Sequence, residues 1–99
     1  MGVSKSILFS KKHNSISSLC KAFGHPARVL MMENILEGGE WVCEDFQEII
    51  PLSRTTIWQH LQQLEAVGLI EGRFQNDTFI YKINNAELET IKTYFNETV

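Results

Sequence analysis

The chain has 99 residues and a mass of 11.4 kDa, which suits one compact domain and excludes a two-domain enzyme. Apolar residues make up 43% of it and only 2 residues are proline, so the composition is typical of a globular domain and not of a disordered one. Nine basic against twelve acidic residues give a net charge of −3, which by itself argues weakly against a polyanionic partner.

No apolar stretch approaches the ~20 residues of a membrane span or the core of a signal peptide, so we expect a cytoplasmic protein without a membrane partner. The two cysteines, Cys20 and Cys43, are too few for a secreted disulfide framework. Their separation also matches no CxxC-type zinc spacing. A reducing compartment and the absence of a bound metal or cofactor are therefore predicted.

The charges are segregated along the chain. Residues 1–32 carry five basic side chains and no acid, whereas residues 33–52 carry six acids and no base. We interpret residues 1–12 as a basic N-terminal arm that either frays in solvent or attracts phosphates, and residues 13–99 as a single domain. The default interpretation of the acidic segment is a solvated face.

Two amphipathic helices are predicted in the first third of the chain. Apolar residues recur at helical spacing over residues 16–23, and Gly24 ends this stripe. A second helix begins at Pro26, because the missing N–H of proline costs nothing in the first helical turn. It runs to the glycine pair at residues 38–39.

The middle of the chain predicts a helix-turn-helix. Trp41 and Val42 form a very short strand, and a brief helix follows and is closed by Pro51. Ser53 is the expected N-cap of a fourth helix, which continues to Gly68.

After Gly68 the apolar period changes from helical to alternating. Residues 70–74 and 79–83 predict two strands of a hairpin around the polar segment 75–78. Asn84 and Glu87 have the spacing of a capping box for a last helix. The predicted fold is mainly α with a small β-hairpin, in the order α-α-β-α-α-β-β-α, which describes a winged helix-turn-helix.

Several short motifs then resemble those of the ArsR/SmtB family over roughly residues 15–95. The motifs are Ala22-Phe23-Gly24-His25-Pro26-Ala27-Arg28, Leu52-Ser53-Arg54-Thr55-Thr56-Ile57, His60-Leu61, Leu64 and Gly68-Leu69-Ile70. The resemblance implies a homodimeric winged-helix repressor whose fourth helix enters the major groove of a two-fold symmetric operator. It also implies that the wing contacts the DNA backbone and that the terminal helices form the dimer. Many members of that family release DNA on binding a metal.

The family's metal ligands are missing from this sequence. Val42 and Glu44 stand where the family's best-known site has two cysteines, and Cys43 stands between those positions. Residues 88–99 contain neither the histidine nor the aspartate of the family's alternative site. No metal site is predicted, and the effector is left open.

The candidate DNA-binding residues follow from the fourth helix and the hairpin. On the helix face opposite the apolar residues, we expect Arg54, Thr55 and Gln59 to reach base edges, because arginine binds guanine and glutamine binds adenine in the major groove. Gln62 is expected to contact phosphate, as are the two wing cations. The full candidate set is Ser53, Arg54, Thr55, Thr56, Trp58, Gln59, Gln62, Arg73 and Lys82.

Three further side chains have competing interpretations. Trp58, where the family has a small hydroxyl residue, either packs on a sugar or a thymine methyl, or covers the seam between helices. His60 and His25 are interpreted as packed, hydrogen-bonded structural residues and not as ligands.

The apolar stripes of the first and last helices predict dimerisation, with an internal core as the alternative. These stripes are Ile16, Leu19 and Phe23, and Leu88, Ile91 and Phe95. Dimerisation is favoured because a chain this short has few other elements to cover both stripes.

No motif of an enzyme is present, so catalysis is not expected. The favoured function is a sequence-specific transcriptional regulator that binds double-stranded DNA. The alternatives are a winged-helix protein-interaction module without DNA binding, and a regulator that responds to thiol oxidation through Cys20 and Cys43.

Overall fold

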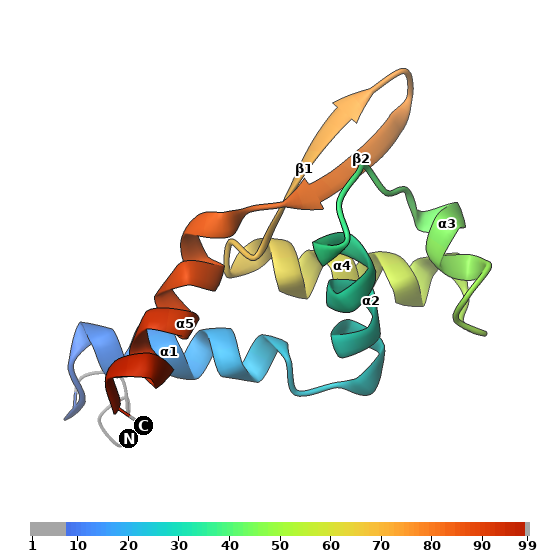
Figure 1. Ribbon diagram of the computed structural model, residues 1–99. Coiled ribbons are helices and arrows are strands. Elements are labelled where there is room, and N and C mark those ends of the chain that lie inside the picture. The colour runs from blue at the N-terminus through green and yellow to red at the C-terminus, as the bar shows by residue number, and fades with distance from the viewer. Residues whose placement is uncertain (1–7, 99) are drawn as a thin grey trace.

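Five helices and a two-stranded hairpin make up the structure, a computed structural model that describes residues 8–98 (Figure 1). The elements are α1 (Lys11–Ala22), α2 (Pro26–Leu36), α3 (Cys43–Gln47), α4 (Arg54–Ala66), β1 (Ile70–Gln75), β2 (Thr78–Ile83) and α5 (Asn85–Thr98). This order confirms the predicted winged helix-turn-helix. Most of the predicted basic arm lies outside the described residues, and its last two residues are the first two of α1.

The helix ends follow the local signals in the sequence. The Ser53 hydroxyl accepts a hydrogen bond of 3.2 Å from the backbone N–H of Thr56, which confirms the predicted N-cap of α4. His25 caps α2, since its Nδ1 accepts from the N–H of Ala27 at 3.0 Å. Gly68 has a φ of +80° just beyond α4, a left-handed conformation that glycine adopts without strain.

Three local predictions differ from the structure. The expected strand at residues 41–42 is a single bridge, in which Trp41 pairs with Tyr81 beside the hairpin. The third helix ends at Gln47, four residues before Pro51. The hairpin turn consists of Asn76 and Asp77 alone, both with positive φ as a two-residue type I′ turn requires, so each strand is longer than predicted.

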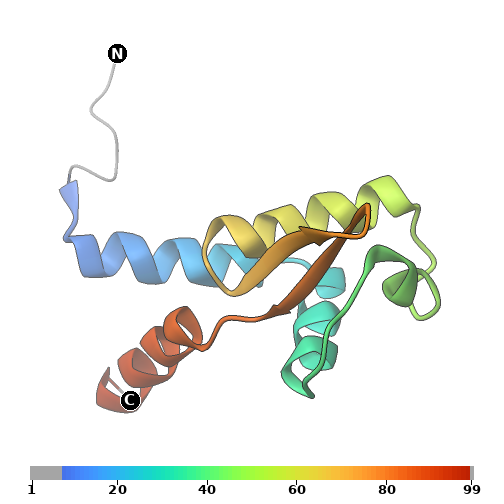
Figure 2. The same ribbon diagram turned by 90° about the horizontal axis from the view of Figure 1, so that it is seen from above.

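Helix α4 is central to the core. It contacts α2, α3 and β1, and Figure 2 shows it lying alongside the hairpin. Its apolar side chains Ile57, Leu61 and Leu64 are fully buried, as predicted from their shared face. They pack with buried residues of the other elements, among them Met31, Met32, Ile35, Phe46, Leu69 and Ile70.

The hairpin is held against α4 by Tyr81 and by the backbone opposite it. Tyr81 is fully buried and pairs across the hairpin with Gly72, whose N–H donates to Glu65 Oε2 on α4 at 2.9 Å. A Cβ atom at position 72 would lie 2.9 Å from both that oxygen and Tyr81 Cε1, so glycine is needed for this close approach. Burial raises the pKa of Tyr81 to about 12, which keeps the phenol neutral.

We expect Tyr81→Ala to lower the free energy of unfolding by about 3–5 kcal/mol, because it removes a fully buried ring and leaves a cavity beneath the wing. Tyr81→Phe should cost about 1 kcal/mol or less, since it removes only one weak hydrogen bond. Urea unfolding followed by circular dichroism measures both changes. Phe74→Ala, at the exposed wing tip, is the control, and an equal loss in that variant would refute a special role for Tyr81.

Candidate nucleic-acid interface

The solvent face of α4 is polar at its N-terminal end. Arg54, Thr55 and Gln59 are all exposed there, on the side opposite the buried residues of the helix, as predicted. None of the three is buried beneath another element, so their side chains are free to approach a groove of DNA from one direction.

Ser53 and Thr56, also predicted as DNA contacts, serve the helix cap. The Ser53 hydroxyl donates to the Thr56 hydroxyl at 3.0 Å while accepting from its backbone N–H. Thr56 is half-buried. These hydroxyls therefore help to position the first turn of α4, and their contact with DNA stays a prediction.

Gln62, predicted to contact phosphate, lies beside the hairpin in the free chain. It is half-buried, and its Nε2 donates to the hydroxyl of Tyr81 at 3.4 Å. The side chain is directed at the base of the hairpin, because residue 62 lies between the exposed face of α4 and the face that the wing covers. The helical spacing did not reveal this, since it does not say where the hairpin docks.

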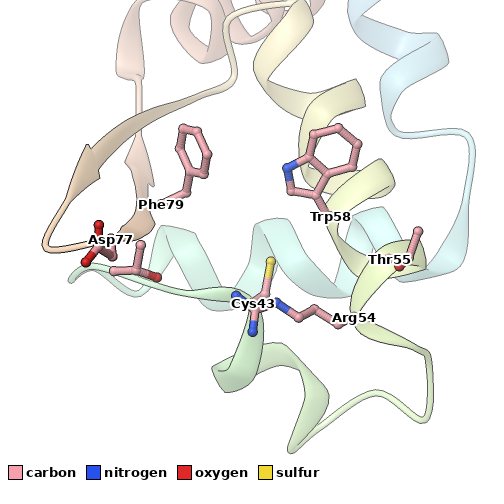
Figure 3. Close-up of a pocket in the computed structure, with 7 residues that line it drawn as sticks. Cys43, Arg54, Thr55, Trp58, Asp77 and Phe79 are labelled. Carbon is pink, nitrogen blue, oxygen red and sulfur yellow. The ribbon is translucent and has the colours of Figure 1, made fainter.

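A cavity of about 240 Å³ separates the start of α4 from the wing tip (Figure 3). Trp58 and Phe79 lie on opposite sides of it, and the thiol of Cys43 points toward the space between them. The cavity is also lined by Arg54, Thr55, Asp77 and Thr78. Trp58 is 45% exposed and presents part of its indole to solvent at this cavity.

His25 and His60, which the sequence predicts to be structural residues, lie next to each other between the start of α2 and α4. The rings of His25 and His60 are 4.4 Å apart between centroids, and Arg28 Nη1 lies 3.1 Å from His60 Nδ1. Arg28 Nε also donates to the carbonyl of Ala22 at 2.6 Å. Burial, with His25 and Arg28 nearby, lowers the pKa of His60 below its usual value, so the ring is neutral at pH 7. These contacts support a structural role.

Each candidate DNA-contacting cation forms an ion pair within the chain. Arg54 pairs with Glu44 at 2.5 Å, and Lys82 pairs with Glu71 at 3.2 Å. Arg73 pairs with Glu40 and also donates to Gln75 Oε1 at 2.9 Å. Local sequence patterns do not reveal these partners. The acidic run of residues 33–52 was the available signal for Glu40 and Glu44, and the hairpin register was the signal for Glu71.

The predicted dimerisation residues range from buried to exposed. Ile16 and Leu19 are buried within the chain, where α1 and α5 contact each other, and Phe23, Leu88 and Ile91 are half-buried. Phe95 is 46% exposed. Leu8 and Phe9, which precede α1, are exposed as well. Figures 1 and 2 both place the start of α1 and the end of α5 at one end of the molecule.

The two cysteines have different surroundings. Cys20 is exposed on α1, whereas Cys43 is 6% exposed and packs in the core at the start of α3. Burial raises the pKa of the Cys43 thiol, only partly opposed by the nearby charge of Arg54, so the reactive thiolate is disfavoured.

Within residues 8–98 no three His, Cys, Asp or Glu side chains lie together as a metal site would require. No helix in this range has both the length and the hydropathy of a membrane span.

No protein-family model matches the chain, but individual proteins do. It is 26% identical over 77 residues to the biofilm growth-associated repressor of Xylella fastidiosa, a match that covers 78% of this chain and 67% of that protein. It is 29% identical over 84 residues to an uncharacterized HTH-type transcriptional regulator of Methanocaldococcus jannaschii, covering 83% of this chain and 93% of that one.

Solved structures of the ArsR type have the same fold. The chain superposes on an ArsR family transcriptional regulator with a TM-score of 0.79 at 13% identity, covering 90% of this chain and 91% of the other. HlyU from Vibrio cholerae gives a TM-score of 0.73 at 22% identity, covering 91% and 98%. The predicted resemblance to the fold of ArsR-type winged-helix regulators is confirmed.

The burial of Cys43 leads to a prediction about thiol chemistry. We expect iodoacetamide at pH 7.5 to alkylate Cys20 quickly and Cys43 at least about tenfold more slowly, because Cys43 is only 6% exposed and its thiolate is disfavoured. Peptide mass spectrometry over time measures both rates. In urea the rates should converge. A native Cys43 that reacts as fast as Cys20 would show that the thiol is accessible and would revive the redox interpretation.

Proposed function

We propose that this chain, which shares its fold and most of its length with ArsR-type regulators, is a homodimeric, sequence-specific DNA-binding repressor. The observation that carries the proposal is the placement of an exposed polar helix face beside a wing that exposes Arg73 and Lys82. The curated relative from Xylella fastidiosa is named a repressor, which supports the same function.

The N-terminal part of α4 is the proposed base-reading element. Arg54, Thr55 and Gln59 are exposed on one face, and in winged-helix proteins such a helix enters the major groove. An arginine guanidinium can donate two hydrogen bonds to guanine, and a glutamine amide can pair with adenine. Trp58 adjoins this face and offers an exposed indole to a sugar or to a thymine methyl.

The wing is the proposed phosphate-binding element. Arg73 and Lys82 are exposed on the hairpin, and their present partners are carboxylates that a phosphate could replace. Phosphate contacts position the protein on any duplex, so these residues would contribute to affinity more than to sequence discrimination.

Dimerisation is proposed through the end of the molecule where α1 begins and α5 ends. Leu8, Phe9 and Phe95 expose large apolar surfaces there, although Leu19 of the predicted stripe belongs to the core of the single chain. A two-fold dimer would present two α4 helices to half-sites about one helical turn apart on a symmetric operator.

The DNA-binding proposal predicts distinct effects for the two elements. Arg54→Ala and Gln59→Ala should each reduce discrimination between operator and unrelated duplex by about 1–3 kcal/mol. Arg73→Ala should instead lower the affinity for both duplexes alike. It should also reduce the magnitude of the slope of log K against log salt by about 0.9. Fluorescence anisotropy measures these quantities at several salt concentrations, with a labelled duplex taken from the DNA upstream of the gene that encodes this chain.

Lys92→Ala on α5 is the matched control for Arg73→Ala. Lys92 is also exposed and paired with a glutamate, but it lies outside the proposed DNA-binding surface. It should bind like the unaltered protein. Failure of the unaltered protein to bind any duplex at low salt would contradict the proposed function and favour a protein-interaction module.

The dimer proposal has its own test. Sedimentation at micromolar concentration should give twice the chain mass of 11.4 kDa, and Phe95→Glu should give the single chain, because it places a charge in the apolar interface. Phe74→Glu places the same charge at the exposed wing tip and should leave the dimer intact. A single-chain species in the unaltered protein would refute the dimer.

A further inference from the structure

The ion pairs of Arg54 and Arg73 link the proposed DNA-binding elements to one acidic part of the chain. Glu44 lies on α3 and pairs with Arg54 in the first turn of α4. Glu40 precedes the Trp41 bridge and pairs with Arg73 on β1. Both acids belong to the run of residues 33–52 that contains no base. The proposed base-reading and phosphate-binding arginines are therefore already bound to carboxylates.

The fold explains why these two acids lie where they do. The backbone of Trp41 donates to and accepts from Tyr81 at 2.9 and 2.8 Å, which holds the adjacent Glu40 beside the hairpin. Helix α3 packs against α4 with Phe46 buried, and Glu44 lies on its exposed side, where it pairs with Arg54. These positions follow from tertiary packing. The Lys82–Glu71 pair differs, because its residues are direct cross-strand partners.

We propose that Glu40 and Glu44 compete with DNA for Arg54 and Arg73. Their carboxylates occupy the positions that phosphate or base oxygens take when DNA binds. The inference rests on the proposed DNA-binding function. In the free protein the two acids neutralise the arginines, and in the complex they are released beside the DNA. They therefore lower the affinity for any duplex and restrict binding to sequences whose base contacts compensate.

The exposure of the pairs makes this competition adjustable. The four side chains are between 43% and 62% exposed, and ion pairs this accessible to water shift equilibria only a few-fold. DNA can displace them, because phosphates form a dense line of negative charge and release counterions on binding. The released carboxylates then repel neighbouring phosphates over a distance set by the salt concentration.

The test uses Glu40→Gln, Glu44→Gln and the double variant, which remove charge while keeping side-chain size. The probe is a labelled duplex of unrelated sequence, so the operator need not be known. We expect each single variant to bind about 2–5-fold more tightly at 50 mM salt, and the double variant about tenfold, since the two pairs share no residue. The gains should shrink at 300 mM salt because screening weakens the repulsion.

Glu33→Gln is the matched control. Glu33 belongs to the same acidic run and makes the same change in net charge, but it lies on α2 and forms no ion pair within residues 8–98. A double-mutant cycle adds a second control, in which Glu40→Gln should give much less gain when Arg73 is already alanine. Equal melting temperatures would show that the variants keep the fold.

The outcomes separate the two proposals. Tighter binding by the Glu40 and Glu44 variants beyond that of Glu33→Gln, with the Glu40→Gln gain dependent on Arg73, supports internal competition. DNA binding by all proteins with no gain over the control, or with a Glu40→Gln gain that persists without Arg73, overturns it. If neither the unaltered protein nor any variant binds the duplex at low salt, the proposed function fails and this inference fails with it.

Discussion

The docking of the hairpin on α4 is the constraint on which the rest of the structure depends. Tyr81 fills the space between them, and the N–H of Gly72 reaches Glu65 only because no Cβ intervenes. Burial of a large ring contributes several kcal/mol, which is much more than the exposed ion pairs around it. Through this contact, two elements that are adjacent in sequence become the two walls of one cavity, with Trp58 on one side and Phe79 on the other.

The same contact organises the charges. Because Tyr81 also pairs with Trp41, the chain between α2 and α3 lies beside the hairpin, and Glu40 comes within reach of Arg73. A protein with a net charge of −3 can then present arginines toward DNA while keeping them neutralised in the free state. In the fold, two acids of the segment 33–52 thus pair with arginines that lie outside it.

Much of the fold could be predicted from local signals. The cap at Ser53, the proline start of α2 and the glycine after α4 depend on backbone hydrogen bonding within a few residues, which sequence describes well. The alternation after Gly68 gave the hairpin register, although its turn is shorter than expected. The sequence predicted less well which residues of other elements a side chain contacts. Gln62 contacts Tyr81 and Trp58 lines a cavity, and neither outcome follows from helical spacing.

The sequence by itself determined the order of the helices and of the two hairpin strands and the buried apolar face of α4, because these depend on residue type and short-range spacing. Only the tertiary structure decided that Cys43 is buried and that Arg54 and Arg73 are paired with Glu44 and Glu40. Those contacts join residues ten or more positions apart. Their formation depends on how the hairpin and α3 pack against α4, which no local pattern encodes.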